Sequence, residues 1–283
     1  MKNSDFPQDS QRIVFRMATT TDRRAQANAQ LSIAPTRSLQ VMRDASELYS
    51  RVFGYASREL SLNPKLLLAI AANGGTTIAA TTPDRELVGF AYGFAGFDGS
   101  RVYHYSQAAF VAPGMQGAGI GRLLKQAQAD EARALGMTTM RWAFDPLLAN
   151  NAHFNFTVLG ARGLWFAPRL YDDDLSARLI VEWQLDEPRP GLLPPTGASV
   201  NGAATVPITP RQWATAVEDG DSVVVPIPAP ATLRTLAPAE VTALRFTLSS
   251  TIAGLLERGL AATACSIVDD LSAAYRFTRT AAA

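Results

Sequence analysis

Val111-Ala-Pro-Gly-Met-Gln-Gly-Ala-Gly-Ile-Gly-Arg122 is the stretch that decides the fold of this chain. It follows an apolar segment, 104–111, that predicts a strand, and it opens a run whose apolar residues recur at helical spacing until Gly136. Glycines at such a junction let the backbone turn tightly and leave its N–H groups uncovered. Because the first turn of a helix has N–H groups without intrahelical partners and a dipole that favours negative charge, the stretch predicts a phosphate-binding loop made of main chain.

The spacing of the glycines distinguishes three kinds of phosphate-binding loop. A dinucleotide fingerprint requires G-x-G-x-x-G, and the series Gly117, Gly119, Gly121 is one residue short of it. A P-loop requires Lys and then Ser or Thr after its last glycine, but Ile120 follows Gly119 here. The remaining interpretation is the pattern Q-x-x-G-x-G, which begins at Gln116.

That pattern resembles the acetyl-coenzyme A signature of the GNAT superfamily of N-acetyltransferases. A second segment, 145–161, also resembles a GNAT segment, since it predicts a turn, a short helix and a glycine stop at Gly160. Two triplets, Asp145-Pro-Leu147 and Val181-Glu-Trp183, are similar to a little-characterised bacterial branch of predicted acetyltransferases. The resemblance extends over Glu86–Leu185.

The resemblance implies an α/β fold, a co-substrate and a set of contacts. The expected fold is a mixed, mostly antiparallel central sheet flanked by helices, and the expected co-substrate is acetyl-coenzyme A, with no metal. In this family the strand before the loop splays from its neighbour and pairs through its backbone with the pantetheine arm, which here involves Phe110 and Val111. Asn151 and Asn155 on the following helix are candidates for further hydrogen bonds. The loop would grip the coenzyme A pyrophosphate through Gln116, Gly117, Ala118, Gly119, Ile120, Gly121 and Arg122.

The sequence offers several candidates for the general base and the general acid. His104 is one candidate base, because its ordinary pKa of ~6.5 suits proton transfer near neutral pH. Glu182 is another, because an acid inside an apolar run needs a partner if it is buried. A hydrogen-bonded structural His and an outward-facing Glu explain the same residues. The position at which GNAT proteins often carry a proton-donating Tyr is Phe156, so Tyr171 becomes the candidate general acid.

Two functions from different classes follow from these observations. The first is direct transfer of an acetyl or other acyl group from coenzyme A to a small-molecule amine, with Asp145, just past a strand end, as the candidate contact for a cationic acceptor. The second is a coenzyme A-binding module without transferase activity, which Phe156 favours. A protein that kept the fold and lost the ligand is a third alternative.

Four regions are expected along the chain. Residues 1–30 form a polar, disordered tail, 31–187 the GNAT-like domain, 188–204 a Pro/Gly-rich linker, and 205–283 an α/β extension or a small second domain. Helices are expected at 38–53, 63–74, 120–135, 150–159 and 238–258. Strands are expected at 31–35, 76–82, 87–97, 104–111, 137–144, 178–185, 222–226, 261–268 and 273–278, with a further short strand at 164–167.

Composition excludes several other classes. The net charge of +1 is no electrostatic footprint for nucleic acid, and Cys265 alone supports neither a disulfide framework nor a cysteine metal site. The two histidines lack metal-ligand spacing, and no apolar run approaches the ~18 residues that would span a bilayer. We therefore expect a cytoplasmic protein, monomeric or homodimeric, without a membrane or nucleic-acid partner.

Overall fold

The computed structural model describes residues 31–55, 60–173, 175–186 and 207–279. The predicted tail, 1–30, and linker, 188–204, lie outside the described residues. The strands are β1 (Ser32–Pro35), β2 (Thr76–Thr81), β3 (Leu87–Phe97), β4 (Val102–Val111), β5 (Thr139–Phe144), β6 (Arg162–Ala167), β7 (Arg178–Gln184), β8 (Val217–Asp219), β9 (Ser222–Pro228), β10 (Leu260–Ile267) and β11 (Ser272–Arg279). The helices are α2 (Leu39–Phe53), α3 (Pro64–Ala72), α4 (Ile120–Ala134), α5 (Ala149–His153), α6 (Pro230–Leu233) and α7 (Pro238–Glu257).

The strands form one continuous sheet in the order β1-β2-β3-β4-β5-β7-β6-β10-β11-β9-β8. Every neighbouring pair is antiparallel except β4 and β5, which run parallel. The predicted fold class, a mixed and mostly antiparallel sheet flanked by helices, is therefore confirmed.

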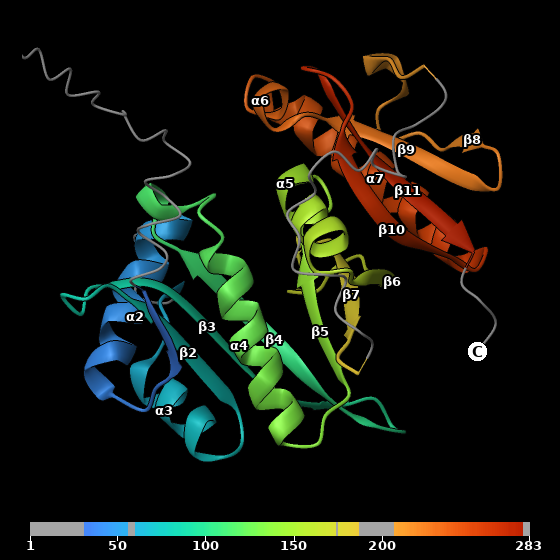
Figure 1. The fold of residues 1–283 in the computed structure, drawn as a ribbon. Helices are drawn as coiled ribbons and strands as arrows, with labels where there is room; N and C mark the ends of the chain where they lie inside the picture. The colour runs from blue at the N-terminus through green and yellow to red at the C-terminus, as the bar shows by residue number, and fades with distance from the viewer. Residues whose placement is uncertain (1–30, 56–59, 174, 187–206, 280–283) are drawn as a thin grey trace, which may run out of the picture.

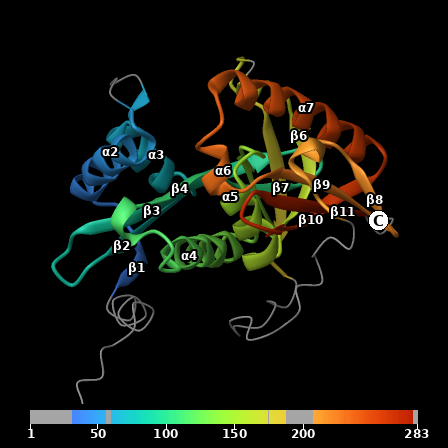
Figure 2. The same cartoon turned by 90° about the horizontal axis from the view of Figure 1, so that it is seen from above.

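Apolar residues at helical spacing fix the helices to the two faces of the N-terminal half of the sheet. On one face, Ile120 and Leu124 of α4 are completely buried against Ile78 of β2. On the opposite face, Met42 of α2 and Leu67 of α3 pack onto the aromatic side chains of β3 and β4. Figures 1 and 2 show the sheet between α4 on one side and α2 with α3 on the other.

The C-terminal strands continue the same sheet. Gly163 of β6 pairs with Ala262 of β10, and a Cβ atom on Gly163 would come within 3.0 Å of the Ala262 Cβ, so the absence of a side chain lets the strands meet. The two halves also share a core, because Tyr275 of β11 is fully buried and donates a hydrogen bond to the Pro146 carbonyl at 2.7 Å. Helix α7 contributes Leu248 and Ile252 to that core.

One predicted helix differs from the structure. The segment expected to be helical over 150–159 is α-helical only at Ala149–His153 and continues as a π-helical turn at Phe154–Val158. The Leu159 N–H bonds to the Phe154 carbonyl at 3.0 Å, which is the wider spacing of a π turn. This widening places Asn155 and Phe156 toward the protein interior, where both are buried.

Candidate functional site

The glycine-rich loop joins β4 to α4 through a single 3-10 turn, Pro113–Met115. Gly117 and Gly119 have φ angles of +75° and +85°, which residues with a side chain adopt only under strain. The Gly119 carbonyl accepts the Arg122 and Leu123 N–H groups at 3.0 and 3.2 Å and so starts the helix. The Gln116 amide donates to the Val111 carbonyl at 3.1 Å, so this side chain braces the loop.

This loop faces solvent while the helix behind it is anchored. Gln116, Gly117 and Gly119 are exposed, whereas Ile120, the first residue of α4, is 1% exposed in the core. The N–H groups that begin a helix have no partners inside it and point out of its N-terminus. An exposed, glycine-rich helix N-terminus held by a buried anchor has the geometry of an anion-binding site.

The neighbouring strands part immediately beside the loop. β4 and β5 pair only at His104↔Met140 and Tyr105↔Arg141, and beyond these residues the two strands diverge (Figure 1). A bulge opposite Tyr92 and Gly93 bends β4 where the divergence begins. A cavity of about 460 Å³ opens there, lined by residues of β4 and β5 together with side chains of α2, α4, α5, the π turn and the β6–β7 loop.

The backbone hydrogen bonds of β4 show which N–H groups face its diverging edge. The Ala112 N–H bonds to the Val88 carbonyl of β3 at 2.8 Å. Because successive N–H groups of a strand point to opposite edges, the Val111 N–H faces the diverging edge. Val111 therefore presents a main-chain donor at the diverging edge, two residues beyond Ala109, which lines the cavity.

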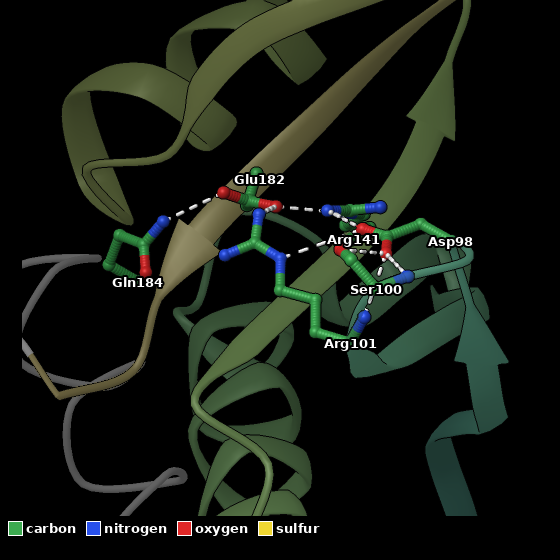
Figure 3. A network of polar contacts seen from close by, with 6 residues as sticks. All are labelled: Asp98, Ser100, Arg101, Arg141, Glu182 and Gln184. Atoms are coloured by element: carbon green, nitrogen blue, oxygen red, sulfur yellow. Dashed lines mark hydrogen bonds and ion pairs between the residues drawn. The ribbon is translucent and has the colours of Figure 1, made fainter. Parts of the chain in front are cut away.

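A charged network holds the other end of the β4–β5 pair closed. The Arg141 guanidinium of β5 donates to Glu182 of β7 at 2.7 Å and to Asp98 of the β3–β4 turn at 2.8 Å, and Arg101 donates to Glu182 at 2.9 Å (Figure 3). The guanidinium carbon of Arg141 also lies 4.1 Å from the centroid of the Tyr103 ring. Backbone and side-chain donors from Arg101 and Ser100, together with Arg141, hold the pKa of Asp98 well below its usual range.

A chain of buried polar side chains crosses the sheet at the point where the strands part. The Lys125 ammonium nitrogen on α4 donates to the Ser106 hydroxyl at 2.7 Å and lies 3.8 Å from the centroid of the Trp142 ring. Ser106 in turn donates to Gln128 at 2.7 Å. Gln128 then donates to the Thr76 hydroxyl at 3.0 Å. Lys125 lines the cavity, so this polar chain reaches the space between the strands.

Comparison with known proteins agrees with this geometry. Residues 41–156, which contain the loop, the diverging strands and Lys125, match the model of the Acetyltransferase (GNAT) family. This part of the chain is therefore similar to the GNAT acetyltransferases. No curated protein sequence matches it.

Three solved structures illustrate what this chain is similar to. The structure of yncA from Salmonella typhimurium with its cofactor acetyl-CoA is 22% identical, with a TM-score of 0.45 over 58% of this chain and 99% of that one. The ribosomal-protein-S18-alanine N-acetyltransferase of Escherichia coli is 16% identical, with the same TM-score and coverage. Naa20 of Chaetomium thermophilum, in complex with a bisubstrate analogue, is 13% identical, with a TM-score of 0.45 over 54% and 86%.

The two predicted bases, His104 and Glu182, are not among the side chains that line the cavity. His104 is fully buried, and its Nε2 is 3.1 Å from the Thr76 hydroxyl. Burial is the main cause that lowers the pKa of His104 from 6.5 to about 4, and Lys125 contributes a smaller part. Glu182 is held by Arg141 and Arg101 at the closed end of the strand pair. Because both side chains are already committed to interior partners, neither is placed to take a proton from an amine.

Asp145 and Tyr171 both line the cavity. One Asp145 carboxylate oxygen accepts the Arg245 guanidinium of α7 at 2.7 Å, and the other accepts the Leu147 N–H at 3.0 Å. The Asp145 charge is thus already paired with Arg245, and its role as a contact for a cationic acceptor stays a prediction. Tyr171 is 58% exposed and lies in the β6–β7 loop at the cavity.

The residues of the second GNAT segment divide into lining and packing positions. Asn151 lines the cavity from α5, and Asn155 lines it from the π turn, where its side-chain oxygen accepts the Trp142 indole N–H at 3.0 Å. Phe156 lies instead in the core, with its ring 6.0 Å from the Tyr275 ring. Phe110 is 3% exposed and packs against α2, so only its main chain is available to a ligand.

Sequence reasoning missed Lys125, Ser106, Gln128 and Trp142. The signal that would have revealed them is the polarity of one helix face. Lys125 and Gln128 interrupt the buried stripe of α4 that Leu124 and Ala132 otherwise keep apolar. A charged residue at a position where helical periodicity expects an apolar one indicates a buried polar contact. Among the described residues, no group of three or more His, Cys, Asp or Glu is arranged to hold a metal ion.

No helix in the described ranges is both long enough and apolar enough to cross a membrane.

Proposed function

We propose that this protein transfers an acetyl group from acetyl-coenzyme A directly to the amine of a small molecule. One observation carries the proposal: β4 and β5 diverge beside an exposed, glycine-rich helix N-terminus, and a cavity opens between them. A phosphate at the helix N-terminus and a thioester between the strands are two ends of the same cofactor. The family match over 41–156 supports this placement.

Each requirement of acyl transfer has a group near the cavity. The N–H groups of Gln116 to Gly121 hold the pyrophosphate, because they begin a helix and face solvent. The Val111 N–H, which points to the diverging edge, polarises the thioester carbonyl. The amine enters through the part of the cavity lined by Tyr49, Tyr55 and Tyr171.

The size of the cavity supports a small acceptor. Its volume of about 460 Å³ falls in the range of roughly 300–1,000 Å³ that is usual for small-molecule sites. Its lining combines aromatic rings such as Tyr49 and Phe53 with a few polar groups such as Arg178, a mixture typical of ligand pockets.

Two measurements test the proposal. Isothermal titration with acetyl-coenzyme A should show stoichiometric binding, and the absence of binding at millimolar ligand would exclude the cofactor. Release of free thiol, followed with a thiol reagent across a panel of amino acids, polyamines and aromatic amines, should identify at least one acceptor.

A second function has one specific observation in its favour. Phe156, buried in the core, occupies the position where a GNAT tyrosine would protonate the leaving thiolate. A coenzyme A-binding module without transfer would bind acetyl-coenzyme A and release no thiol with any amine. The panel therefore separates the two functions.

A further inference from the structure

We propose that Lys125 is the catalytic proton carrier of the transfer: its side-chain nitrogen takes a proton from the acceptor ammonium and delivers it to the coenzyme A thiolate. The inference rests on the proposed function, since it assigns a residue to that reaction. It comes from the geometry at the point where β4 and β5 part, and it concerns a residue that neither the glycine-rich loop nor the second GNAT segment contains.

The position of Lys125 is the first step of the argument. The residue is 4% exposed, yet it lines the cavity between the diverging strands. Its nitrogen donates to Ser106, the first β4 residue beyond the closed pairs, and lies over the ring of Trp142, the first β5 residue beyond them. The Lys125 nitrogen therefore lies where β4 and β5 begin to diverge. It belongs to α4, the helix that follows the glycine-rich loop.

The orientation of the nitrogen is also fixed. The Ser106 hydroxyl gives its own proton to Gln128, so it can only accept from Lys125. The Trp142 ring is in turn oriented by its indole hydrogen bond to Asn155 at 3.0 Å. In its neutral form, the Lys125 nitrogen donates one hydrogen to Ser106 and retains one hydrogen and its lone pair.

The charge state suits a proton carrier. Burial lowers the pKa of Lys125 well below 10.5. Among the described residues, no carboxylate forms an ion pair with Lys125 that would raise this pKa again. Burial thus favours the neutral amine, and a neutral amine can accept a proton and return it. The charged and titratable groups that face it across the cavity or along the polar chain are His104, Asp145, Arg178, Tyr49, Tyr55 and Tyr171.

Three of these neighbours, His104, Asp145 and Tyr49, do not supply a competing proton carrier. His104 stays neutral because burial lowers its pKa to about 4. Asp145 is paired with Arg245. Burial raises the pKa of Tyr49 to about 12, so this phenol stays protonated at neutral pH.

The proton balance closes with one lysine. The acceptor ammonium gives one proton to the neutral Lys125 nitrogen, and the resulting amine attacks the thioester carbon. The carbon–sulfur bond then breaks, and its electron pair leaves with the thiolate. Lys125 returns its proton to that thiolate to form the free thiol. The nitrogen of the adduct loses a second proton to solvent and keeps the third in the amide.

The test uses the full-length protein and the best amine of the panel. Lys125→Met removes the proton carrier and keeps the length of the side chain, and Lys125→Arg keeps a positive charge that cannot titrate near neutral pH. Lys65→Met, at an exposed position of α3, is the matched control. Acetyl-coenzyme A affinity, kcat and the pH profile of kcat/KM are measured for each protein, with circular dichroism to verify folding.

We expect both Lys125 variants to bind acetyl-coenzyme A within about threefold of the wild type, and their kcat to fall by about 10²- to 10⁴-fold. The acidic limb of the wild-type kcat/KM profile should disappear in both, and Lys65→Met should match the wild type. A folded Lys125→Met or Lys125→Arg protein with kcat within tenfold of the wild type, or with that limb intact, would overturn the inference and leave the proposed function standing. A wild type that neither binds acetyl-coenzyme A nor releases thiol would overturn the proposed function itself.

Discussion

The two ends of the β4–β5 pair differ in how their buried basic side chain is partnered. At the closed end, the Arg141 guanidinium is satisfied by two carboxylates and two aromatic rings, those of Tyr103 and Trp165. At the open end, Lys125 is buried with one hydroxyl and one ring. The Arg141 guanidinium, paired with two carboxylates, holds the strands together. The Lys125 amine has no carboxylate partner, so burial disfavours its protonated form and the amine is available for proton transfer.

The largest expected effect comes from breaking the closed end. Arg141→Met leaves Glu182 and Asp98 without their main partner, and removing one member of a buried ion pair costs about 3–5 kcal/mol. Urea unfolding should show that loss in the free energy of unfolding. The double variant Arg141→Met/Glu182→Gln should recover part of it, because the stranded carboxylate is then removed. A single variant as stable as the wild type would show that the network does not hold the strands.

The second effect concerns the phosphate loop beside the open end. Gly119→Glu puts a side chain at a φ of +85° and a negative charge at the N-terminus of α4. We expect acetyl-coenzyme A affinity, measured by titration calorimetry, to fall about 100-fold, or ~2.7 kcal/mol. Gly220→Glu, at a φ of +62° in the β8–β9 turn, is the matched control for backbone strain and should bind like the wild type. Equal losses in both variants would assign the effect to folding.

The third effect is a pH-dependent difference in stability at the open end. The folded state binds the Lys125 proton less tightly than the unfolded state, because burial lowers the pKa from 10.5. The unfolded state therefore binds more protons between the folded pKa and 10.5, and wild-type stability rises with pH in that window, by at most ~1.4 kcal/mol per pH unit.

Lys125→Met removes that dependence. The variant should be more stable than the wild type near pH 7, and its advantage should shrink as the pH approaches 10. Urea midpoints at pH 7, 8, 9 and 10 measure it, with Lys65→Met as the control. An advantage that stays constant with pH would mean that Lys125 keeps an ordinary pKa.

The smallest expected change in stability comes from Arg101, the exposed arginine of the charged network. The Arg101 side chain is 45% exposed while it contacts Glu182. An exposed ion pair contributes ~0–1 kcal/mol and is screened by salt. Arg101→Ala should therefore lower the unfolding free energy by less than ~1 kcal/mol in dilute buffer and by nothing measurable in 1 M NaCl. If Arg101→Ala lowered the unfolding free energy as much as Arg141→Met, the two arginines would contribute equally to stability.

Much of the fold could be predicted because its signals are local. Asn63 accepts the Lys65 and Leu66 N–H groups as the predicted helix cap, and Gly136 ends the α4 region with a φ of +80°. Strand β3 has the predicted bounds, 87–97. The short strand β8 was not predicted, because three residues carry no periodicity. The π turn at Phe154–Val158 was also missed, since its wider spacing reflects packing in the interior.

The candidate site was only partly predictable. The glycine-rich loop is a contiguous stretch whose chemistry depends on its own backbone, so its residues could be named in advance. His104 and Glu182 were chosen as bases from their types, but their partners, Thr76 and Arg141, come from distant strands. The role of Lys125 could not be predicted from the sequence, because it depends on contacts with Ser106 and Trp142 that only the folded structure creates.

The glycine-rich loop, most helices and strands, and the resemblance to GNAT proteins could be predicted from the sequence, because helix starts, glycine turns and apolar periodicity act over neighbouring residues. That the C-terminal strands continue the same sheet could not be predicted. Only the tertiary structure decided which charges are paired and which one stands beside the cavity. Charge state and proton transfer depend on burial and on partners within hydrogen-bond distance, and both are set by strands that meet at one end and part at the other.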